Sequence, residues 1–489
     1  MNIAHLKAKI LDLAVRGKLT EQRPEDGSAA ELLARVREEK QRLIAAGKIK
    51  KEKPLPEITE DEKPFNIPAG WEWCRLPELC IKAITDGTHN SPPQQRQGDF
   101  LYITAKNIKD NGIDLTNVSY VTREIHNQIY ARCNPEKGDV LLTKDGTIGI
   151  ATVNNLDYPF SMLSSIALIK PVTQLLPWYL TYVLRSPYWQ TLMHSDSKGS
   201  ALRRIILEQI NSFIVPLPPL AEQKRIVEKI EAIFEQADII EENRLALKTA
   251  VRHTKSRVLD LAVRGKLTEQ RPEEGSAEEL LERIREEKQR LIAEGKLKKE
   301  KPLPEITEEE IPFDIPAGWK WVRLGEIGTW QAGCTPDTTR KDFYENGTIP
   351  WINSADLTDG YIDTITHYVT EKAFTEKKMR LNKTGAVCVA MYGATIGKTG
   401  ILTVDATTNQ AVCVCNLLSS MDSKYLFYFL QFHKPFFVMK GFGGAQPNIS
   451  KEKIENTPFP LPLLAEQKRI VEKIEQIFDT LDTIEKAVE

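Results

Sequence analysis

The stretch PLPPLAEQKRIVEKIEAIF at residues 216–234 returns almost unchanged as PLPLLAEQKRIVEKIEQIF at residues 460–478. A longer repeat accompanies it. Residues 11–76, which begin LDLAVRGKLTEQ, return at residues 259–324 with 55 of 66 positions identical. Self-similarity on this scale indicates a duplicated architecture. The sequence therefore predicts two copies of one framework within a single chain.

Two inserts, residues 77–215 and 325–459, separate the framework blocks and share only fragments of sequence. In each, short apolar stretches alternate with Gly, Asn, Asp and Pro, which favours a mixed α/β globule with several β-hairpins. A chain that keeps its framework nearly constant while two inserts of similar length differ is arranged to present two different surfaces.

Residues 220–265 carry a heptad pattern typical of a long helix that pairs along a narrow seam. The seam positions are Ile226, Ile230, Ile233, Ala237, Ile240, Arg244, Leu247, Val251, Thr254, Val258 and Leu261, and Gly265 favours a stop. The segments at both chain ends repeat this pattern in phase, position 489 corresponding to 245 and position 1 to 249. We therefore expect a second long helix cut in two, in a pseudo-twofold molecule whose termini meet.

Each framework copy also predicts a shorter helix. Capping boxes at Ser28/Glu31 and Ser276/Glu279 would open these helices, and Gly47 and Gly295 would end them. A Lys-rich run follows in each copy: Lys48, Lys50, Lys51 and Lys53, then Lys296, Lys298, Lys299 and Lys301. Such runs are usually solvated surface. Docking to DNA phosphate or to an acidic partner is the alternative.

Composition narrows the functional classes. The chain has 489 residues, of which 41% are hydrophobic and 27% charged, as in ordinary globular proteins. No apolar run reaches the length of a membrane span and no signal-peptide pattern opens the chain, so we expect a cytoplasmic protein without membrane contact. Seven Cys without a CxxC pair and seven scattered His predict no structural metal site. A net charge of −2 leaves nucleic-acid binding to local patches.

The stretch MYGATIGKTG at residues 391–400 resembles a phosphate-binding loop, but it has three residues between Gly393 and Gly397 where that loop needs four. The related stretch GDVLLTKDGTIGIATV at residues 138–153 has Ile150 where Lys398 stands. Both stretches predict an apolar strand, a glycine turn and a second strand. We therefore expect neither a nucleotide nor another cofactor on this chain, and no catalytic residue.

Polar loop residues of the inserts are the candidates for DNA contact, because Arg and Lys pair with guanine while Asn and Gln pair with adenine. In the first insert they are His89, Asn90, Gln94, Gln95, Arg96, Lys198, Arg203 and Arg204. In the second they are Thr335, Thr338, Thr339, Arg340, Lys341, Gln446 and Asn448.

Taken together, these motifs resemble the specificity (S) subunits of type I restriction-modification systems over nearly the whole chain. The resemblance is carried by the two repeats above, the segments IPAGWEW and IPAGWKW, GDVLLTKDGTIG, TIPWINSADL at 348–357 and GGAQPNIS at 443–450. The first insert departs from the family pattern, with SMLSSIALIK at 161–170 where the second has TTNQAVCVCN at 407–416.

The resemblance implies an α+β fold, with two mixed α/β target recognition domains separated by two long antiparallel helices. The corresponding parts are 1–20, the N-terminal half of the split helix; 21–76, framework; 77–215, recognition domain 1; 216–266, the central helix; 267–324, framework; 325–459, recognition domain 2; and 460–489, the C-terminal half of the split helix.

The resemblance further implies that each domain reads one half of a bipartite site in double-stranded DNA. Two modification (M) subunits would bind the chain and methylate adenine with S-adenosylmethionine, and restriction (R) subunits would add translocation and cleavage that use ATP and Mg²⁺. A helix over 220–265, rising about 1.5 Å per residue, would span roughly 70 Å. That length is close to two turns of B-DNA at about 34–36 Å each.

Two other functions stay open on the residues alone. An adenine methyltransferase needs an Asn/Asp-Pro-Pro-aromatic motif to hold the flipped base, and the nearest stretch, residues 90–93, reads Asn-Ser-Pro-Pro. A coiled-coil adaptor with two protein-binding domains would show the same repeats. Adenine methylation assayed with the chain alone, and then with its genomic neighbours' products, separates the three functions.

The split helix predicts that a permuted chain folds. Residue 489 joined to residue 1 through a three-residue helical linker, with the chain reopened at 246–248, should keep the two half-sites and the recruitment of M subunits. The reason is that short helix fragments need the long helix to be stable in water. Sequencing of methylated DNA measures the outcome. An insoluble permutant, or a changed spacer between the half-sites, would show that the termini do not meet.

Overall fold

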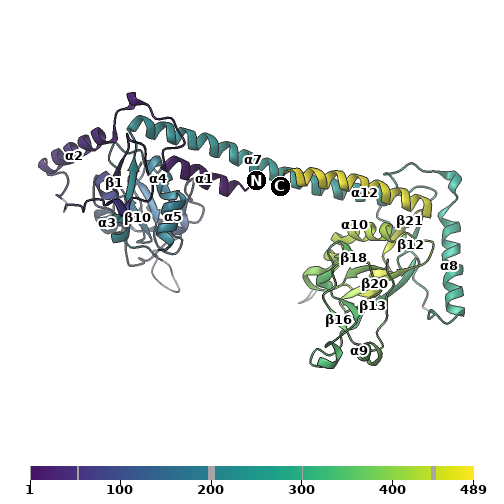
Figure 1. Cartoon of the computed structure of the whole chain (residues 1–489). Coiled ribbons are helices and arrows are strands. Elements are labelled where there is room, and N and C mark those ends of the chain that lie inside the picture. Colours follow the sequence, from purple (N-terminus) through teal and green to yellow (C-terminus); the bar gives the residue numbers. More distant parts are fainter. Residues whose placement is uncertain (1, 52–53, 196–203, 300, 442–447, 489) are drawn as a thin grey trace. The chain divides into compact units, whose positions relative to one another are not determined.

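The computed structural model of the chain describes residues 2–51, 54–195, 204–299, 301–441 and 448–488. Its contacts divide the chain into two units, Met1–Asn243 and Arg244–Glu489. Each unit combines long helices with several small β-sheets (Figure 1), which confirms the predicted α+β class.

In the first unit, helix α1 (Ile3–Val15) packs against the first part of helix α7 (Leu220–Val263). Lys7 near the start of α1 forms an ion pair with Asp238 at 2.5 Å, whereas Thr20, beyond the end of α1, donates a hydrogen bond to Glu222 at 3.1 Å. As residue numbers rise from Lys7 to Thr20, the numbers of their partners on α7 fall from Asp238 to Glu222. The two helices are therefore antiparallel.

The second unit repeats this arrangement with helix α12 (Leu464–Ala487) against the last part of α7. Lys255 pairs with Asp482 and lies 5.3 Å from the ring centroid of Phe478, while Gln270 donates to Glu466 at 2.5 Å. Each chain end thus packs on α7 within its own unit, as the repeats predict. That the two ends form one interrupted helix stays a prediction.

The predicted seam is confirmed at five positions of α7, but Thr254, also predicted to lie in the seam, is exposed. Ile226, Ile230, Ala237, Val251 and Val258 are buried. Ile240, near the middle of the helix, is 47% exposed. The hydrophobic seam therefore stabilises the two ends of α7 more than its centre.

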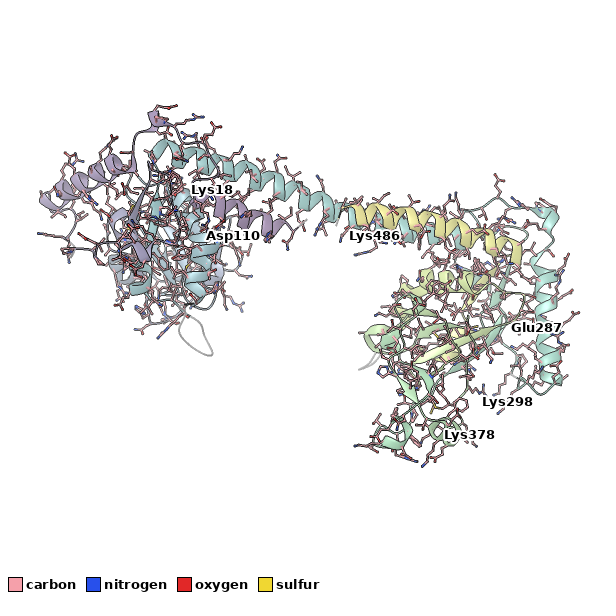
Figure 2. All side chains as sticks on the ribbon, viewed as in Figure 1. Lys18, Asp110, Glu287, Lys298, Lys378 and Lys486 are labelled. Carbon is pink, nitrogen blue, oxygen red and sulfur yellow. The ribbon has the colours of Figure 1, made fainter. Side chains whose placement is uncertain are left out.

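Gly265 ends α7 as predicted, and Gly17, at the equivalent position of the repeat, ends α1 in the same way. Gly17 and Gly265 have φ of +67° and +64°, and the following amides, Lys18 N (Figure 2) and Lys266 N, donate to Leu13 O and Leu261 O. This pattern closes α1 and α7 by satisfying carbonyls of the last turn.

The shorter helices are α2 (Ala29–Ala45) and α8 (Ala277–Ala293), each followed by the predicted glycine with positive φ. Ser28 Oγ accepts from Glu31 N at 3.3 Å and caps α2, which confirms the serine half of the predicted capping box. The Ser276 side chain makes no capping hydrogen bond to α8, so the predicted capping box is wrong there. The second helix begins at the same repeat position without it.

The first insert is closed by strand β1 (Glu72–Arg75), which pairs antiparallel with β11 (Ile214–Leu217). Its main sheet has the order β2-β10-β7-β8. The strands are β2 (Thr85–Asp86), β10 (Ile166–Ile169), β7 (Val140–Thr143) and β8 (Ala151–Val153). A smaller sheet, β6-β3-β9, joins β6 (Ser119–Val121), β3 (Phe100–Ile103) and β9 (Ser161–Met162).

The remaining elements of the first insert are the hairpin β4 (Ile108–Lys109) and β5 (Gly112–Ile113) and helices that cover the sheets. The helices are α3 (Arg123–Arg132), α4 (Pro177–Arg185), α5 (Pro187–Ser195) and α6 (Leu207–Asn211). The core includes Trp189 of α5, Leu142 of β7 and Ile230 of α7, so insert and framework share one hydrophobic cluster.

The second insert has the same plan. β12 (Lys320–Arg323) pairs with β21 (Pro458–Leu461) at its base. The main sheet, β13-β20-β17-β18-β15, contains β13 (Gly328–Ala332), β20 (Val412–Leu417), β17 (Val387–Ala390), β18 (Thr399–Leu402) and β15 (Gly360–Ile362). The small sheet joins β16 (Tyr368–Val369), β14 (Ile349–Ile352) and β19 (Thr407–Thr408). Helices α9 (Glu371–Glu376), α10 (Ser423–Gly441) and α11 (Lys451–Glu455) complete it.

One buried contact of the framework is predicted to be costly to remove. Trp71 Nε1 donates to Glu222 Oε2 at 2.8 Å, and Trp319 Nε1 donates to Glu466 Oε2 at the same distance. Trp71→Phe and Trp319→Phe each leave a buried carboxylate short of a donor. We expect each to lower the free energy of unfolding by about 1–3 kcal/mol, measured by urea denaturation. Trp73→Phe, in the adjacent strand where the ring packs on Phe65, is the control for lost ring area. Equal effects of Trp71→Phe and Trp73→Phe would contradict the prediction.

Candidate functional site

Four segments of the first unit meet beside the ends of strands β2, β7 and β9. They are residues 87–90, 144–150, 163–165 and 204–205, which we call loop cluster 1. Thr88 N donates to Met162 O at 3.0 Å, and Lys144 N donates to Ser165 O at 2.9 Å. Ile205 N donates to Lys144 O at 2.8 Å. Loops far apart in the sequence are therefore tied into one surface by backbone hydrogen bonds.

The second unit builds loop cluster 2 from residues 333–335, 391–397, 409–411 and 448–449 with the same bonds. Cys334 N donates to Thr408 O at 2.9 Å, Met391 N to Ala411 O at 2.8 Å and Ile449 N to Met391 O at 2.9 Å. The two clusters thus share three equivalent backbone hydrogen bonds, although their sequences share little.

Two glycines hold equivalent places in the clusters. A Cβ added at Gly87 would lie 1.8 Å from Met162 O, and one added at Gly333 would lie 2.0 Å from Thr408 O. Only a residue without a side chain allows the first loop to approach the turn after the small sheet so closely. The backbone of both clusters is therefore fixed by the same local requirement.

The side chains at the base of the two clusters differ in kind. In the first unit, Asp86 of β2 pairs with Ala167 of β10, and Lys144 follows β7. The equivalent positions in the second unit are Ala332, which pairs with Cys413, and Met391. Cluster 1 therefore rests on a carboxylate and an ammonium group, where cluster 2 has two apolar side chains.

Asp86 is the centre of the charged base. Its side chain is 2% exposed, and each carboxylate oxygen has a cationic partner. Arg132, at the end of α3, donates to Oδ1 at 2.7 Å, and Lys144 Nζ lies 3.2 Å from Oδ2. His89 Nε2 lies 3.4 Å from Oδ1 and 3.3 Å from the Arg132 guanidinium. Asp86, Arg132 and Lys144 together therefore carry one net positive charge.

The sequence-based candidates of the first insert divide between two places. His89, Asn90 and Arg204 lie in loop cluster 1 and are exposed. Gln94, Gln95 and Arg96 are also exposed, but they lie elsewhere, because the Gln95 backbone pairs with Tyr120 of β6, on the opposite side of β3 from β9. Lys198 and Arg203 lie outside the described residues.

In the second insert, Thr335 and Asn448 lie in loop cluster 2. The Thr335 hydroxyl contacts the Gln410 side chain, and the Asn448 backbone pairs with Tyr392. Thr338 and Lys341 are exposed outside the cluster, and Gln446 lies outside the described residues.

Two further candidates of the second insert are occupied by local contacts. Thr339 donates from its amide and hydroxyl to Asp337, at 2.9 and 2.8 Å, and so holds a turn. Arg340 is bound by Asp342 and by Glu376 of α9. Its bond to Asp342, together with Lys372 beside the same carboxylate, holds the pKa of Asp342 well below its usual range. Both side chains therefore serve the local structure in the unbound protein.

The sequence did not single out Asp86, Arg132 or Lys144. A sequence comparison could have marked Lys144, because it stands in GDVLLTKDGTIG where the related hairpin has Met391. The sequence gives no indication of Arg132, because it lies 46 residues from Asp86 and no repeat marks it.

The hairpin prediction at 391–400 is confirmed. β17 and β18 pair antiparallel, and Gly393 and Gly397 between them have φ of +64° and +73°. The backbone of Lys398 belongs to this hairpin, since Lys398 O accepts from Ala390 N at 2.8 Å. No helix begins directly after the turn, as it would in a phosphate-binding loop.

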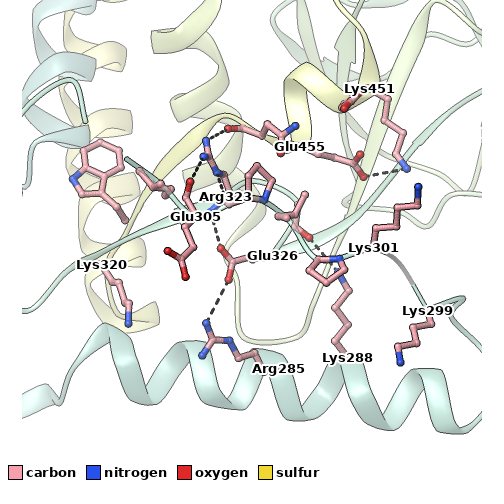
Figure 3. A pocket seen from close by; sticks show the side chains of 18 of the residues that line it. Arg285, Lys288, Lys299, Lys301, Glu305, Lys320, Arg323, Glu326, Lys451 and Glu455 are labelled. Atoms are coloured by element: carbon pink, nitrogen blue, oxygen red, sulfur yellow. Dashed lines mark hydrogen bonds and ion pairs between the residues drawn. The ribbon is translucent and has the colours of Figure 1, made fainter. Parts of the chain in front are cut away.

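A large cavity of about 1290 Å³ lies away from the loop clusters, among α8, the connector at 301–306 and α11 (Figure 3). Its charged lining is already partly paired. Arg285 lies 3.6 Å from Glu326, Lys288 donates to Gly325 O at 3.2 Å, and Lys451 pairs with Glu455 at 3.0 Å. Framework and second-insert residues therefore line this cavity together, and two lysines of the second Lys-rich run, Lys299 and Lys301, are among them.

Within the described part of the chain, no group of three or more His, Cys, Asp or Glu side chains is placed to hold a metal ion. Among the same residues, no helix combines the length and apolar character needed to cross a membrane.

Comparison with known proteins shows which proteins this chain resembles. The family model of the type I restriction modification DNA specificity domain matches residues 68–249 and again 316–489. The EcoAI specificity subunit of Escherichia coli is 28% identical, with 99% of this chain and 90% of the relative covered. The EcoEI specificity subunit of the same species is 27% identical, with 100% and 91% covered.

Two solved structures share the fold. One is described as the structural basis of complex assembly and conformational transition of the type I R-M system. It matches with a TM-score of 0.59 at 20% identity, and the match covers 87% of this chain and 94% of the solved chain. The HsdS subunit of Thermoanaerobacter tengcongensis matches with a TM-score of 0.54 at 21% identity, over 88% and 94%.

The hairpin geometry predicts that Lys398 has no nucleotide to bind. Lys398→Ala should change the free energy of unfolding by no more than about 0.5 kcal/mol, the usual range for a surface side chain, and calorimetric titration of the purified chain with ATP should give no signal in either protein. Lys341→Ala, at an exposed position of the same unit, is the matched control. ATP binding that Lys398→Ala abolishes and Lys341→Ala preserves would restore the phosphate-loop interpretation.

Proposed function

The chain belongs to the family of type I restriction-modification DNA specificity subunits, and from this we propose that it reads a bipartite site in double-stranded DNA. Each unit would read one half-site through its own loop cluster. The chain itself would catalyse no reaction.

The observation that supports two separate half-sites is the contrast between the loop clusters. Their backbones are joined by equivalent hydrogen bonds, so both present loops in the same way. Their bases differ, with Asp86 and Lys144 in one and Ala332 and Met391 in the other. Because base edges are distinguished by the pattern of donors, acceptors and apolar groups that meets them, two clusters of different chemistry suit two different sequences.

The partners we propose follow from the repeated framework. Residues 11–76 and 259–324 are identical at 55 of 66 positions, so the chain offers nearly the same surface twice. This supports binding of two modification subunits, which would carry S-adenosylmethionine and methylate adenine in the cytoplasm. Restriction subunits that use ATP and Mg²⁺ would join the same complex.

Exchange of an insert tests this proposal. Replacing residues 77–215 with a second copy of 325–459 should give a complex that methylates a near-symmetric site, composed of two inverted copies of one half-site. The framework strand β1 should carry Cys74→Val, because Val322 is the residue that pairs with Phe459 in the native second unit. Sequencing of methylated DNA from cells that express the hybrid with its modification subunits measures the site.

The reciprocal hybrid, with 77–215 in both places and Val322→Cys, is the matched control. It should methylate the other near-symmetric site. Retention of the original asymmetric site by either hybrid would contradict the assignment of one half-site to each insert.

A further inference from the structure

Arg132 differs from the other cations of loop cluster 1 in how it is held. Its side chain is 54% exposed, yet its guanidinium donates to the 2%-exposed Asp86 at 2.7 Å. Lys144 is only 11% exposed and contacts the other carboxylate oxygen. Lys144 therefore neutralises the buried anion, while Arg132 uses it as an anchor and keeps much of its surface in solvent.

We propose that Arg132 reads a guanine in the half-site of the first unit and that Asp86 is the residue that positions it. This inference rests on the proposed function. Asp86 and His89 both contact Nη2 of Arg132, so they hold this end of the guanidinium in place before DNA arrives. The other N–H groups of the fork are left to meet O6 and N7 of guanine together. A phosphate contact needs less precise positioning, because phosphate presents acceptors in many directions.

The neighbours of Arg132 fit this role. His89, a sequence-based candidate, lies 3.3 Å from the guanidinium in the adjacent loop. The loop that carries His89 is itself fixed, since Thr88 is bonded through its backbone to the turn after β9. Arg132 and His89 thus present polar groups side by side from two different elements, α3 and the loop after β2.

The second unit supplies a natural comparison. At the positions of Asp86 and Lys144 it has Ala332 and Met391, which cannot anchor a guanidinium. The double substitution Asp86→Ala/Lys144→Met therefore gives the first unit the two residues that the second unit has at the equivalent positions. Because it removes both charges of the buried pair, it avoids leaving one buried charge without its partner.

The test uses the full chain assembled with its modification subunits, and the methylated DNA is sequenced to give the preference at every position of both half-sites. Arg132→Ala and Asp86→Ala/Lys144→Met should each relax a single guanine of one half-site, by about 5- to 100-fold in discrimination. The half-site of the second unit should be unchanged in the same molecules. Arg132→Lys keeps the charge but lacks the fork, so it should leave the guanine relaxed.

Asp110→Asn is the matched control for loss of an Asp–Arg contact. Asp110 (Figure 2) pairs with Arg185 at 2.6 Å in the same unit, outside loop cluster 1, and its substitution should leave every base preference intact. Thermal unfolding of each variant monitors the fold. Should the double variant fail to assemble, Arg132→Ala and Arg132→Lys, at a half-exposed side chain, still decide the question.

Two results would overturn the proposal. If Arg132→Ala weakens methylation but leaves the base preferences unchanged, Arg132 contacts phosphate instead of a base. If neither the amount of methylation nor the base preferences change, Arg132 does not contact DNA. Both outcomes leave the proposed function standing if the insert exchange moves the half-sites. If the insert exchange also fails to move them, the proposed function fails as well.

Discussion

The framework depends on a buried hydrogen bond between an indole and a carboxylate. Glu222, 1% exposed at the start of α7, accepts from Trp71 and also from Gln22, at 2.8 Å in each case. A buried carboxylate is costly unless donors surround it. The requirement fixes three segments at once: the turn after α1, the Trp that leads into the insert, and the first turn of the long helix. Glu466, Trp319 and Gln270 repeat the arrangement in the second unit.

This contact explains how each insert is joined to the helices. Trp71 precedes β1, and β11, the partner of β1, leads directly into α7. The first and last strands of the insert are therefore anchored where the helix begins. Arg75 of β1 strengthens the base of the insert by binding Glu62 at 2.7 and 2.8 Å, and it holds the pKa of that carboxyl at about 2. The residues that form these bonds lie outside loop cluster 1.

The framework could be predicted from the sequence because its contacts are repeated. Heptad spacing located α7 and much of its seam, glycines located helix ends, and the duplication predicted that the framework is built twice. The loop chemistry could not be predicted in the same way. Arg132 meets Asp86 only because α3 folds over the end of β2, and no local pattern reports such a contact.

The candidate residues show the same limit. Residue type correctly marked His89 and Asn448 as polar loop positions, and the structure places both in a loop cluster. It also marked Arg340, whose guanidinium is bound by Asp342 and Glu376. A sequence shows that an arginine can donate hydrogen bonds, but it does not show whether neighbouring carboxylates have already accepted them.

The contrast between the two clusters shows how a common backbone can carry different recognition chemistry. Loss of Asp86 alone would leave the Lys144 ammonium largely buried without this partner, which is destabilising. Loss of Lys144 alone would still leave Asp86 paired with Arg132. The second unit has the exposed Ala332 and the buried Met391 at the equivalent positions, so the related backbone carries no charge there. The framework contacts of Trp71 and Arg75 do not touch the charged pair of cluster 1, so the chemistry of the loops can change without a change in the bonds that hold the insert to α7.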